Sequence, residues 1–189
     1  MMRPLRRRAV LIGAVALCTA RAQTQAQSQR ASPDPWFEAL DTEQGRHRFK
    51  FWGFDVYEAV LRVGPAFEPL AHERHPMALS LTYARAFKGA DIARRSVEEI
   101  ERQAPIDAAT RQRWIDVLTA LFPDVSSGDT LMGAYRPAQG VQLWRRGTAW
   151  QSVGDITDLA LARRFMGIWL SPATSQPAMR AALLGLKPV

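Results

Sequence analysis

Cysteine is nearly absent from this chain of 189 residues, since Cys18 is the only one. One cysteine cannot close a disulfide within the chain, and Cys18 lies in a segment that we expect to be removed on export. The mature chain is therefore expected to have neither disulfides nor thiol chemistry. A domain of about 150 residues can be held together by its hydrophobic core alone.

Long hydrophobic runs are also scarce, and the clearest one, AVLIGAVALCTA at residues 9–20, is too short to span a bilayer, which needs about 20 residues. Four arginines precede it and Ala20-Arg21-Ala22 follows it. Charged, apolar and then small residues predict a secretory signal peptide over residues 1–22 rather than a buried N-terminal helix. We expect a Gln-rich flexible leader at 23–35, a folded domain at 36–189, and a periplasmic or secreted protein exported by the Sec or twin-arginine route.

An excess of charge of one sign is missing once the signal peptide is discounted. The formal net charge is +7, but five arginines lie within residues 1–22, so the remainder carries +2. A nearly balanced domain gives no support to nucleic-acid binding or to attachment by general basicity. No integral membrane segment is expected after signal removal.

The familiar catalytic and metal-binding motifs are absent. The sequence contains no G-x-S-x-G, no P-loop, no H-E-x-x-H and no cysteine pair. His72 and His75 have the spacing of two metal ligands, but no third ligand is evident, so loop histidines are the preferred interpretation. We therefore predict neither a metal nor a cofactor.

Hydrophobic periodicity indicates strands, then helices, then strands and helices again. Alternation predicts strands at 46–54, 56–63 and 77–83, and again at 129–135, 141–146 and 148–153. Helical spacing predicts helices at 89–103, 107–122 and 155–170, the second of them with Asp107 as its cap. It also predicts a short terminal helix with Ser175 as N-cap, Pro177 in its first turn and Gly185 after its end. This order favours an α+β fold, with an antiparallel sheet covered by helices on one face.

Five segments, in this order, resemble the chalcone isomerase-like family in its exported bacterial branch. They are FWGFDVYEAVLRV, MALSLTYARAFKGADIARRSVEEI, LFPDVSSGDTLMGAY, GDITDLALARRFMGIWL and SPATSQPAMRAALLG, and they span roughly residues 36–185. The resemblance implies an open-faced β-sandwich, with a large antiparallel sheet, helices packed on one side, and a cleft between the two layers.

The resemblance also implies where a site would lie. The plant enzymes of the family close a flavanone ring by intramolecular addition of a phenolate to an enone, steadied by an arginine near the start of the sheet. Arg46 or Arg48 matches that region, and Thr174 matches the polar residue of the terminal corner. Three other polar positions of the enzymes are changed, being occupied here by Trp52, Ile92 and Glu99.

Two functions follow from this comparison. In the favoured one, the domain binds a small apolar molecule with an acidic end, such as a fatty acid. Its carboxylate would pair with Arg46 or Arg48 beside Thr174, against an apolar wall of Trp52, Tyr83, Ile92 and Trp169. The alternative is an intramolecular lyase or isomerase that uses the arginine with Thr174 and Tyr83. A structural partner of other envelope proteins is a third possibility.

Overall fold

A computed structural model describes residues 35–187. The predicted signal peptide and nearly all of the predicted leader lie outside the described residues. The element order is α1 (Pro35–Glu38), β1 (Thr42–Phe51), β2 (Phe54–Val63), the 3-10 helix η1 (Pro69–Arg74), β3 (Met77–Tyr83), α2 (Gly89–Gln103), α3 (Ala108–Leu121), β4 (Thr130–Arg136), β5 (Gly140–Arg146), β6 (Trp150–Ile156), α4 (Leu159–Leu170) and α5 (Pro177–Leu184).

The six strands form one antiparallel sheet in which each strand pairs with its neighbours in sequence, in the order β1-β2-β3-β4-β5-β6. The register places Ala59 beside Leu81 and Leu61 beside Leu79, so that the alternating apolar residues of adjacent strands share one face. That face is buried under the helices in one large core.

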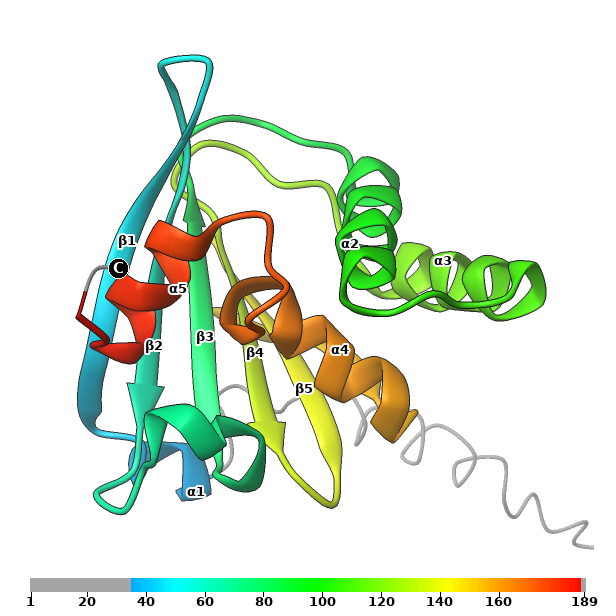
Figure 1. Cartoon of the computed structure of the whole chain (residues 1–189). Helices are drawn as coiled ribbons and strands as arrows, with labels where there is room; N and C mark the ends of the chain where they lie inside the picture. Colours follow the sequence, from blue (N-terminus) through cyan, green and yellow to red (C-terminus); the bar gives the residue numbers. More distant parts are fainter. Residues whose placement is uncertain (1–34, 188–189) are drawn as a thin grey trace, which may run out of the picture. The chain divides into compact units, whose positions relative to one another are not determined.

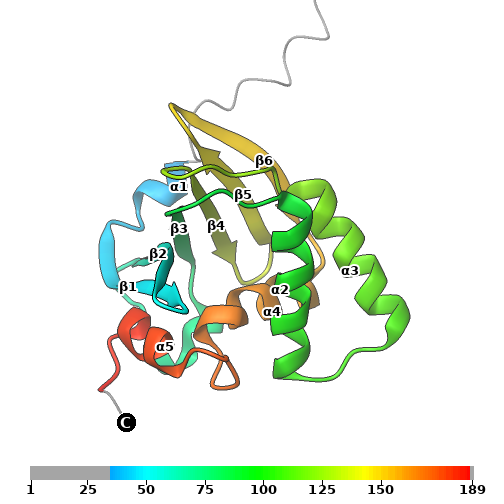
Figure 2. The same ribbon diagram turned by 90° about the horizontal axis from the view of Figure 1, so that it is seen from above.

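Helices α2–α5 lie on this face of the sheet (Figures 1 and 2), whereas Trp36 and Phe37 of α1 pack against a second, smaller core on the opposite face. Helix α5 packs against β1 and β2, whereas α4 packs against β4, β5 and β6. Helix α2 packs instead against α3 and α4, so it forms part of an outer layer. The expected α+β fold, an open antiparallel sheet with helices on one side, is confirmed.

Two helix starts differ from the prediction. Asp155 lies at the end of β6, and α4 begins only after Asp158, whose carboxylate accepts hydrogen bonds from the N–H groups of Ala160 and Leu161 at 2.9 and 3.1 Å. Pairing with β5 extends the strand beyond the predicted limit. Ser175 does not cap α5: Gln176 holds the N-cap position, without a side-chain hydrogen bond.

The strand predicted at 46–54 runs through the turn at Trp52-Gly53 that separates β1 from β2, whereas the boundaries of two helices are confirmed. Asp107 caps α3 by accepting a hydrogen bond from the Thr110 N–H at 2.9 Å. Pro177 occupies the first turn of α5, and Gly185 ends that helix in the left-handed conformation, with φ 66°.

Candidate functional site

A cavity of about 370 Å³ lies between the sheet and the helices. Its interior wall is made mainly of apolar and aromatic side chains from β2, β3, β4 and α4, among them Tyr57, Leu81, Tyr83, Leu131, Phe165 and Trp169. The lining residues that are exposed or half-buried include Asp91 and Arg95 on α2, and Ser175 and Gln176 in the corner before α5. These residues mark the mouth of the cavity.

Three of the predicted site residues come together here. Tyr83, Ile92 and Trp169 all line the cavity, from β3, α2 and α4 respectively. The resemblance of the chain to the family suggested this position for all three residues, and each belongs to the apolar pattern of its own strand or helix. All three therefore lie on the largely apolar wall of the cavity, and their role in ligand binding stays a prediction.

Arg46 and Arg48 need correction, because neither lines the cavity. Their neighbour Phe49 pairs with Tyr57 and lines the cavity, so the arginines, which alternate with it along β1, point to the opposite face of the sheet. Their side chains are 57% and 62% exposed and lie 3.9 Å from Glu58. Neither arginine can reach a ligand in the cavity.

Trp52 and Thr174 also lie outside the cavity lining. Trp52 is 86% exposed, at the turn between β1 and β2. The Thr174 hydroxyl donates to the carbonyl of Ile168 at 2.6 Å and accepts from the N–H of Gln176 at 3.2 Å. Thr174 therefore stabilises the corner, and it is Ser175 and Gln176 that the corner presents at the cavity mouth.

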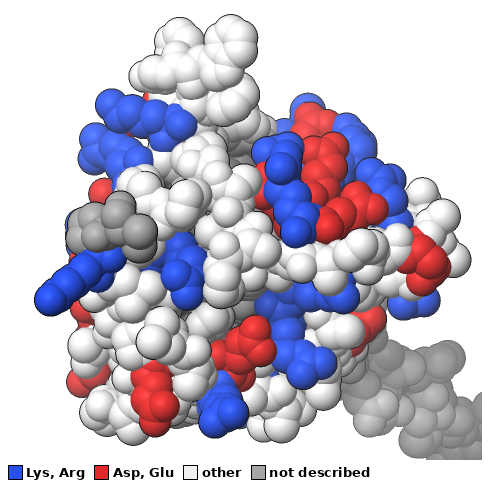
Figure 3. Space-filling model, viewed as in Figure 1, with Lys and Arg blue, Asp and Glu red and all other residues white. Residues whose placement is uncertain are grey.

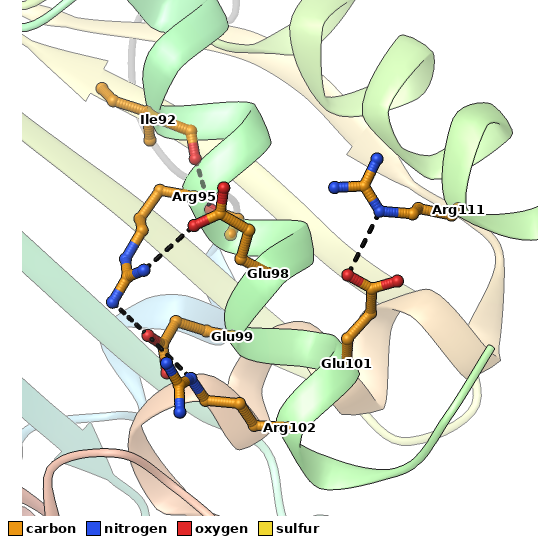
Figure 4. A network of polar contacts seen from close by, with 8 residues as sticks. Ile92, Arg95, Glu98, Glu99, Glu101, Arg102 and Arg111 are labelled. Atoms are coloured by element: carbon orange, nitrogen blue, oxygen red, sulfur yellow. Dashed lines mark hydrogen bonds and ion pairs between the residues drawn. The ribbon is translucent and has the colours of Figure 1, made fainter. Parts of the chain in front are cut away.

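The charged group at the mouth is Arg95 with its carboxylate partners on α2, and Arg95 is not among the predicted site residues. Arg95 donates to Glu98 at 3.0 Å and to Glu99 at 2.5 Å, and Arg102 lies 3.5 Å from the same Glu99 oxygen (Figure 4). The Glu99 side chain is only 7% exposed, whereas those of Arg95 and Arg102 are more than half exposed. The cavity is therefore bordered by a buried carboxylate held between two guanidinium groups.

The helical spacing of α2 could have predicted that Arg95 and Glu99 lie beside the cavity. Ile92, Ser96 and Glu99 follow one another at i, i+4 and i+7, so they share a face of α2, and Arg95 adjoins them at i+3. A glutamate in line with apolar residues on a helix is unusual, because buried carboxylates need partners. The sequence analysis names Glu99 only as a change from a polar residue of the family's enzymes, and it does not predict the ion pair that Glu99 makes with Arg95.

Two phenol hydroxyls add polarity inside the cavity. Tyr57 Oη accepts a hydrogen bond from Trp169 Nε1 at 3.1 Å, and the Tyr57 and Tyr83 rings meet edge to face at 6.0 Å. Within residues 35–187, Tyr83 Oη makes no hydrogen bond. Burial raises the pKa of Tyr57 to about 12 and raises the pKa of Tyr83 further. Both hydroxyls therefore stay protonated and can donate to a ligand.

All three tyrosines of the chain should titrate late in the native protein. Burial raises the pKa of Tyr135 as well, so every tyrosine is affected. In the unfolded chain tyrosine ionises near pH 10. The unfolded state therefore loses protons that the native state keeps, and stability should fall as the pH rises above about 10.

Ultraviolet titration of tyrosinate measures this directly. The native protein should titrate at higher pH than the same protein in guanidinium chloride, and Tyr57→Phe should reduce the loss of stability at alkaline pH. Coincident native and denatured titrations would contradict the predicted burial of these hydroxyls.

The predicted histidine pair has no ligand-like arrangement. His72 Nδ1 lies 3.2 Å from the Pro69 carbonyl and the side chain is buried, unlike a solvated loop residue, while His75 meets the Phe67 ring edge-on. Within residues 35–187, no three His, Cys, Asp or Glu side chains are grouped closely enough to hold a metal ion. No helix in that part of the chain has the length and apolar character needed to cross a membrane.

Comparison with known proteins gives the context of this site. An uncharacterized protein of Haemophilus influenzae is 29% identical over 110 residues, covering 58% of this chain and 52% of the relative. This chain thus matches about half the length of that relative. Among solved structures, a fatty-acid binding protein of Arabidopsis thaliana superposes with a TM-score of 0.56 at 12% identity, covering 75% of this chain and 85% of the other.

The structural neighbour shares the fold, and the sequence match identifies the family. The sequence profile of the chalcone isomerase-like family matches residues 46–185, from the middle of β1 to the end of α5. It includes every strand pairing of the sheet and every helix around the cavity. This chain belongs to the chalcone isomerase-like family.

Proposed function

We propose that this protein binds an apolar small molecule with an acidic end, such as a fatty acid, in the cavity between the sheet and α2, and that it does so in the periplasm or outside the cell. The observation that carries the proposal is the cavity, which is apolar inside and has an arginine at its mouth. Its volume of about 370 Å³ falls within the range of small-molecule pockets, about 300–1,000 Å³.

The charges indicate how such a ligand lies. A carboxylate is costly to bury in an apolar interior unless it is paired, so the acidic end belongs at the mouth and the alkyl chain inside. Arg95 uses two of its five N–H donors, one for Glu98 and one for Glu99, and has others left for a ligand carboxylate. The hydroxyls of Tyr57 and Tyr83 lie inside and can donate to a polar group along the ligand.

Two further observations support a binding protein over an isomerase. One solved structure with the same fold is a fatty-acid binding protein, although likeness at 12% identity extends only to the fold. Isomerase chemistry like that of the family's plant enzymes would need a β1 arginine in the cavity, and Arg46 and Arg48 lie on the other face of the sheet.

The proposal that the protein is exported depends on the pattern of charged, apolar and small residues at 1–22.

Isothermal titration calorimetry with delipidated protein tests whether the cavity mouth recognises the acidic end of a ligand. The two ligands compared are dodecanoate and its neutral analogue dodecanol. Arg95→Ala should weaken dodecanoate binding about tenfold, the size expected for one charge-assisted hydrogen bond at an exposed site, and should leave dodecanol unaffected. Glu99→Gln should strengthen dodecanoate binding, because it removes a negative charge from the cavity wall while keeping an oxygen that can accept from Arg95.

Arg113→Ala is the matched control, since Arg113 is an exposed arginine outside the cavity lining. It should change neither affinity. No dodecanoate binding, or equal losses for acid and alcohol in Arg95→Ala, would contradict the proposed orientation. Chalcone cyclisation should proceed at its spontaneous rate; faster turnover that Arg95→Ala abolishes would favour the isomerase.

A further inference from the structure

The turn between β1 and β2 carries three exposed aromatic side chains. Phe51, Trp52 and Phe54 are 61%, 86% and 66% exposed, and only Gly53 separates the last two. In Figure 3 the region where Figure 1 shows this turn is an uncharged projection that stands out from the surface. We call residues 51–54 the aromatic tip.

The backbone of the tip makes Trp52 an unfavourable choice for stability. Phe51 pairs with Phe54, so Trp52 and Gly53 form a two-residue hairpin loop, with φ of 51° and 80°. This type of loop favours Asn-Gly, because asparagine tolerates a positive φ and tryptophan does not. Trp52, the most exposed large apolar side chain within residues 35–187, thus lies where the local conformation disfavours tryptophan, and core packing gives no reason for it.

Basic side chains surround the base of the tip. Lys50 and Arg48 lie on β1, and the Arg85 guanidinium lies 5.7 Å from the centre of the Phe54 ring. Two acidic residues oppose them: Asp55 is 3.6 Å from Lys50 and Glu58 is 3.9 Å from Arg48. These ion pairs are long and the Arg48 and Lys50 side chains are more than half exposed, so the pairs contribute little to stability and both cations remain accessible to anionic headgroups. Figure 3 shows lysine and arginine side chains gathered below the uncharged projection.

The tip is also continuous with the cavity. Phe49 and Val56, two residues before and after the tip on the same hairpin, line the cavity wall. Tyr83, two residues before Arg85, lines it as well. Whatever surface the tip contacts therefore lies close to one end of the cavity.

We propose that the aromatic tip inserts into the interface of an anionic phospholipid bilayer. Tryptophan and phenylalanine enter the boundary between headgroups and acyl chains, where the amphipathic indole is favoured, while lysine and arginine remain among the phosphates. One short loop with a small excess of positive charge gives reversible attachment. This inference does not depend on which ligand the cavity holds.

Vesicle sedimentation with the full-length chain tests the proposal. Vesicles of phosphatidylcholine with phosphatidylglycerol should bind the protein several-fold more strongly than vesicles of phosphatidylcholine alone. The double variant Trp52→Asn, Phe54→Ser should reduce binding about tenfold. Trp52→Asn alone should melt no lower than the wild type, because asparagine suits the positive φ, and it should weaken binding by a smaller amount.

Leu70→Ser is the control for loss of an exposed apolar side chain. Leu70 is 79% exposed on η1, which follows the other end of β2, and this variant should bind vesicles as the wild type does. All variants share residues 1–34, so differences among them report on the tip. Brominated phospholipid should quench fluorescence in the wild type more than in Trp52→Phe, which keeps an apolar side chain at the tip.

Unchanged vesicle binding in the double variant, with no quenching that depends on Trp52, would overturn the proposal. If the aromatic tip instead contacts a second copy of the chain, the protein should self-associate in the absence of vesicles, and the double variant should abolish this association. That result would also overturn the proposal. Dodecanoate affinity should be the same in the double variant and the wild type, so failure of bilayer docking is distinguishable from failure of the proposed ligand binding.

Discussion

Gly45→Ala is expected to lower the free energy of unfolding by about 3 kcal/mol, at the upper end of what overpacking costs. A Cβ atom on Gly45 would lie 2.1 Å from the carbonyl oxygen of Ala182 and 2.8 Å from that of Leu183. Both are backbone atoms of α5, so no side-chain rotation relieves the clash. The helix has to move away from the sheet.

The consequence extends to the cavity. Gln44 donates to the Leu184 carbonyl at 3.0 Å, which ties α5 to β1, and Met179 on α5 lines the cavity 4.0 Å from Tyr57 Oη. Displacing α5 therefore opens the wall as well as the core. Ligand affinity should fall together with stability in Gly45→Ala.

Chemical denaturation of Gly45→Ala and Gly64→Ala measures the effect. A Cβ on Gly64 would meet only ordinary contacts, 3.7 Å from the Ala39 carbonyl oxygen and 3.9 Å from Leu40. This control should stay within about 0.5 kcal/mol of the wild type. Equal stabilities for the two variants would mean that α5 does not pack as closely on β1 as the structure shows.

Leu131→Trp is expected to abolish retention of the proposed apolar ligand while leaving the fold intact. Leu131 lies on β4, is 7% exposed and lines the cavity, so a larger side chain has space to extend into it. The indole would occupy the volume that the alkyl chain needs. Because it fills empty space, we expect the delipidated variant to melt no lower than delipidated wild type.

Mass spectrometry of organic extracts from purified protein is the direct measurement. The wild type should carry an apolar acid, and Leu131→Trp should carry none. Val117→Trp, which adds an indole at an exposed position of α3, should retain the ligand. Should the tryptophan prove too large to fold, Leu131→Phe gives a smaller version of the same change.

Ligand binding should also raise the stability of the native protein. A ligand present at a hundred times its Kd raises the stability of the native state by about 2.7 kcal/mol, and that increment should be missing in Leu131→Trp. If extracts of the wild type contain no bound molecule in any preparation and added fatty acid does not raise its melting temperature, the binding function is wrong.

The error over Arg46 and Arg48 could have been avoided from the sequence. These residues alternate with Phe49, and period-two alternation alone places arginines and phenylalanine on opposite faces of a strand. Matching positions to the family's arginine overrode that local rule. Trp52 was assigned to the cavity wall in the same way, although the glycine that follows it is a common residue in the turn of a hairpin.

The sequence by itself determined the main helices, most of the strands and the fold class, but not the short helices α1 and η1 or the turn between β1 and β2. Strand alternation, helical spacing and the caps at Asp107 and Gly185 are local patterns, and local patterns decide local structure. The order of these elements, with the family resemblance, was enough to predict an antiparallel sheet covered on one face. The absence of a long apolar run and the balanced charge likewise needed no coordinates.

Only the tertiary structure decided which charge reaches the cavity. Arg95 and Glu99 lie at its mouth because α2 packs on α3 and α4 rather than directly on the sheet, and that distance depends on contacts between segments far apart in sequence. The same holds for α5, whose position depends on the missing side chain of Gly45. Periodicity gives the direction of a side chain relative to its own helix or strand; what it faces is determined by packing between elements.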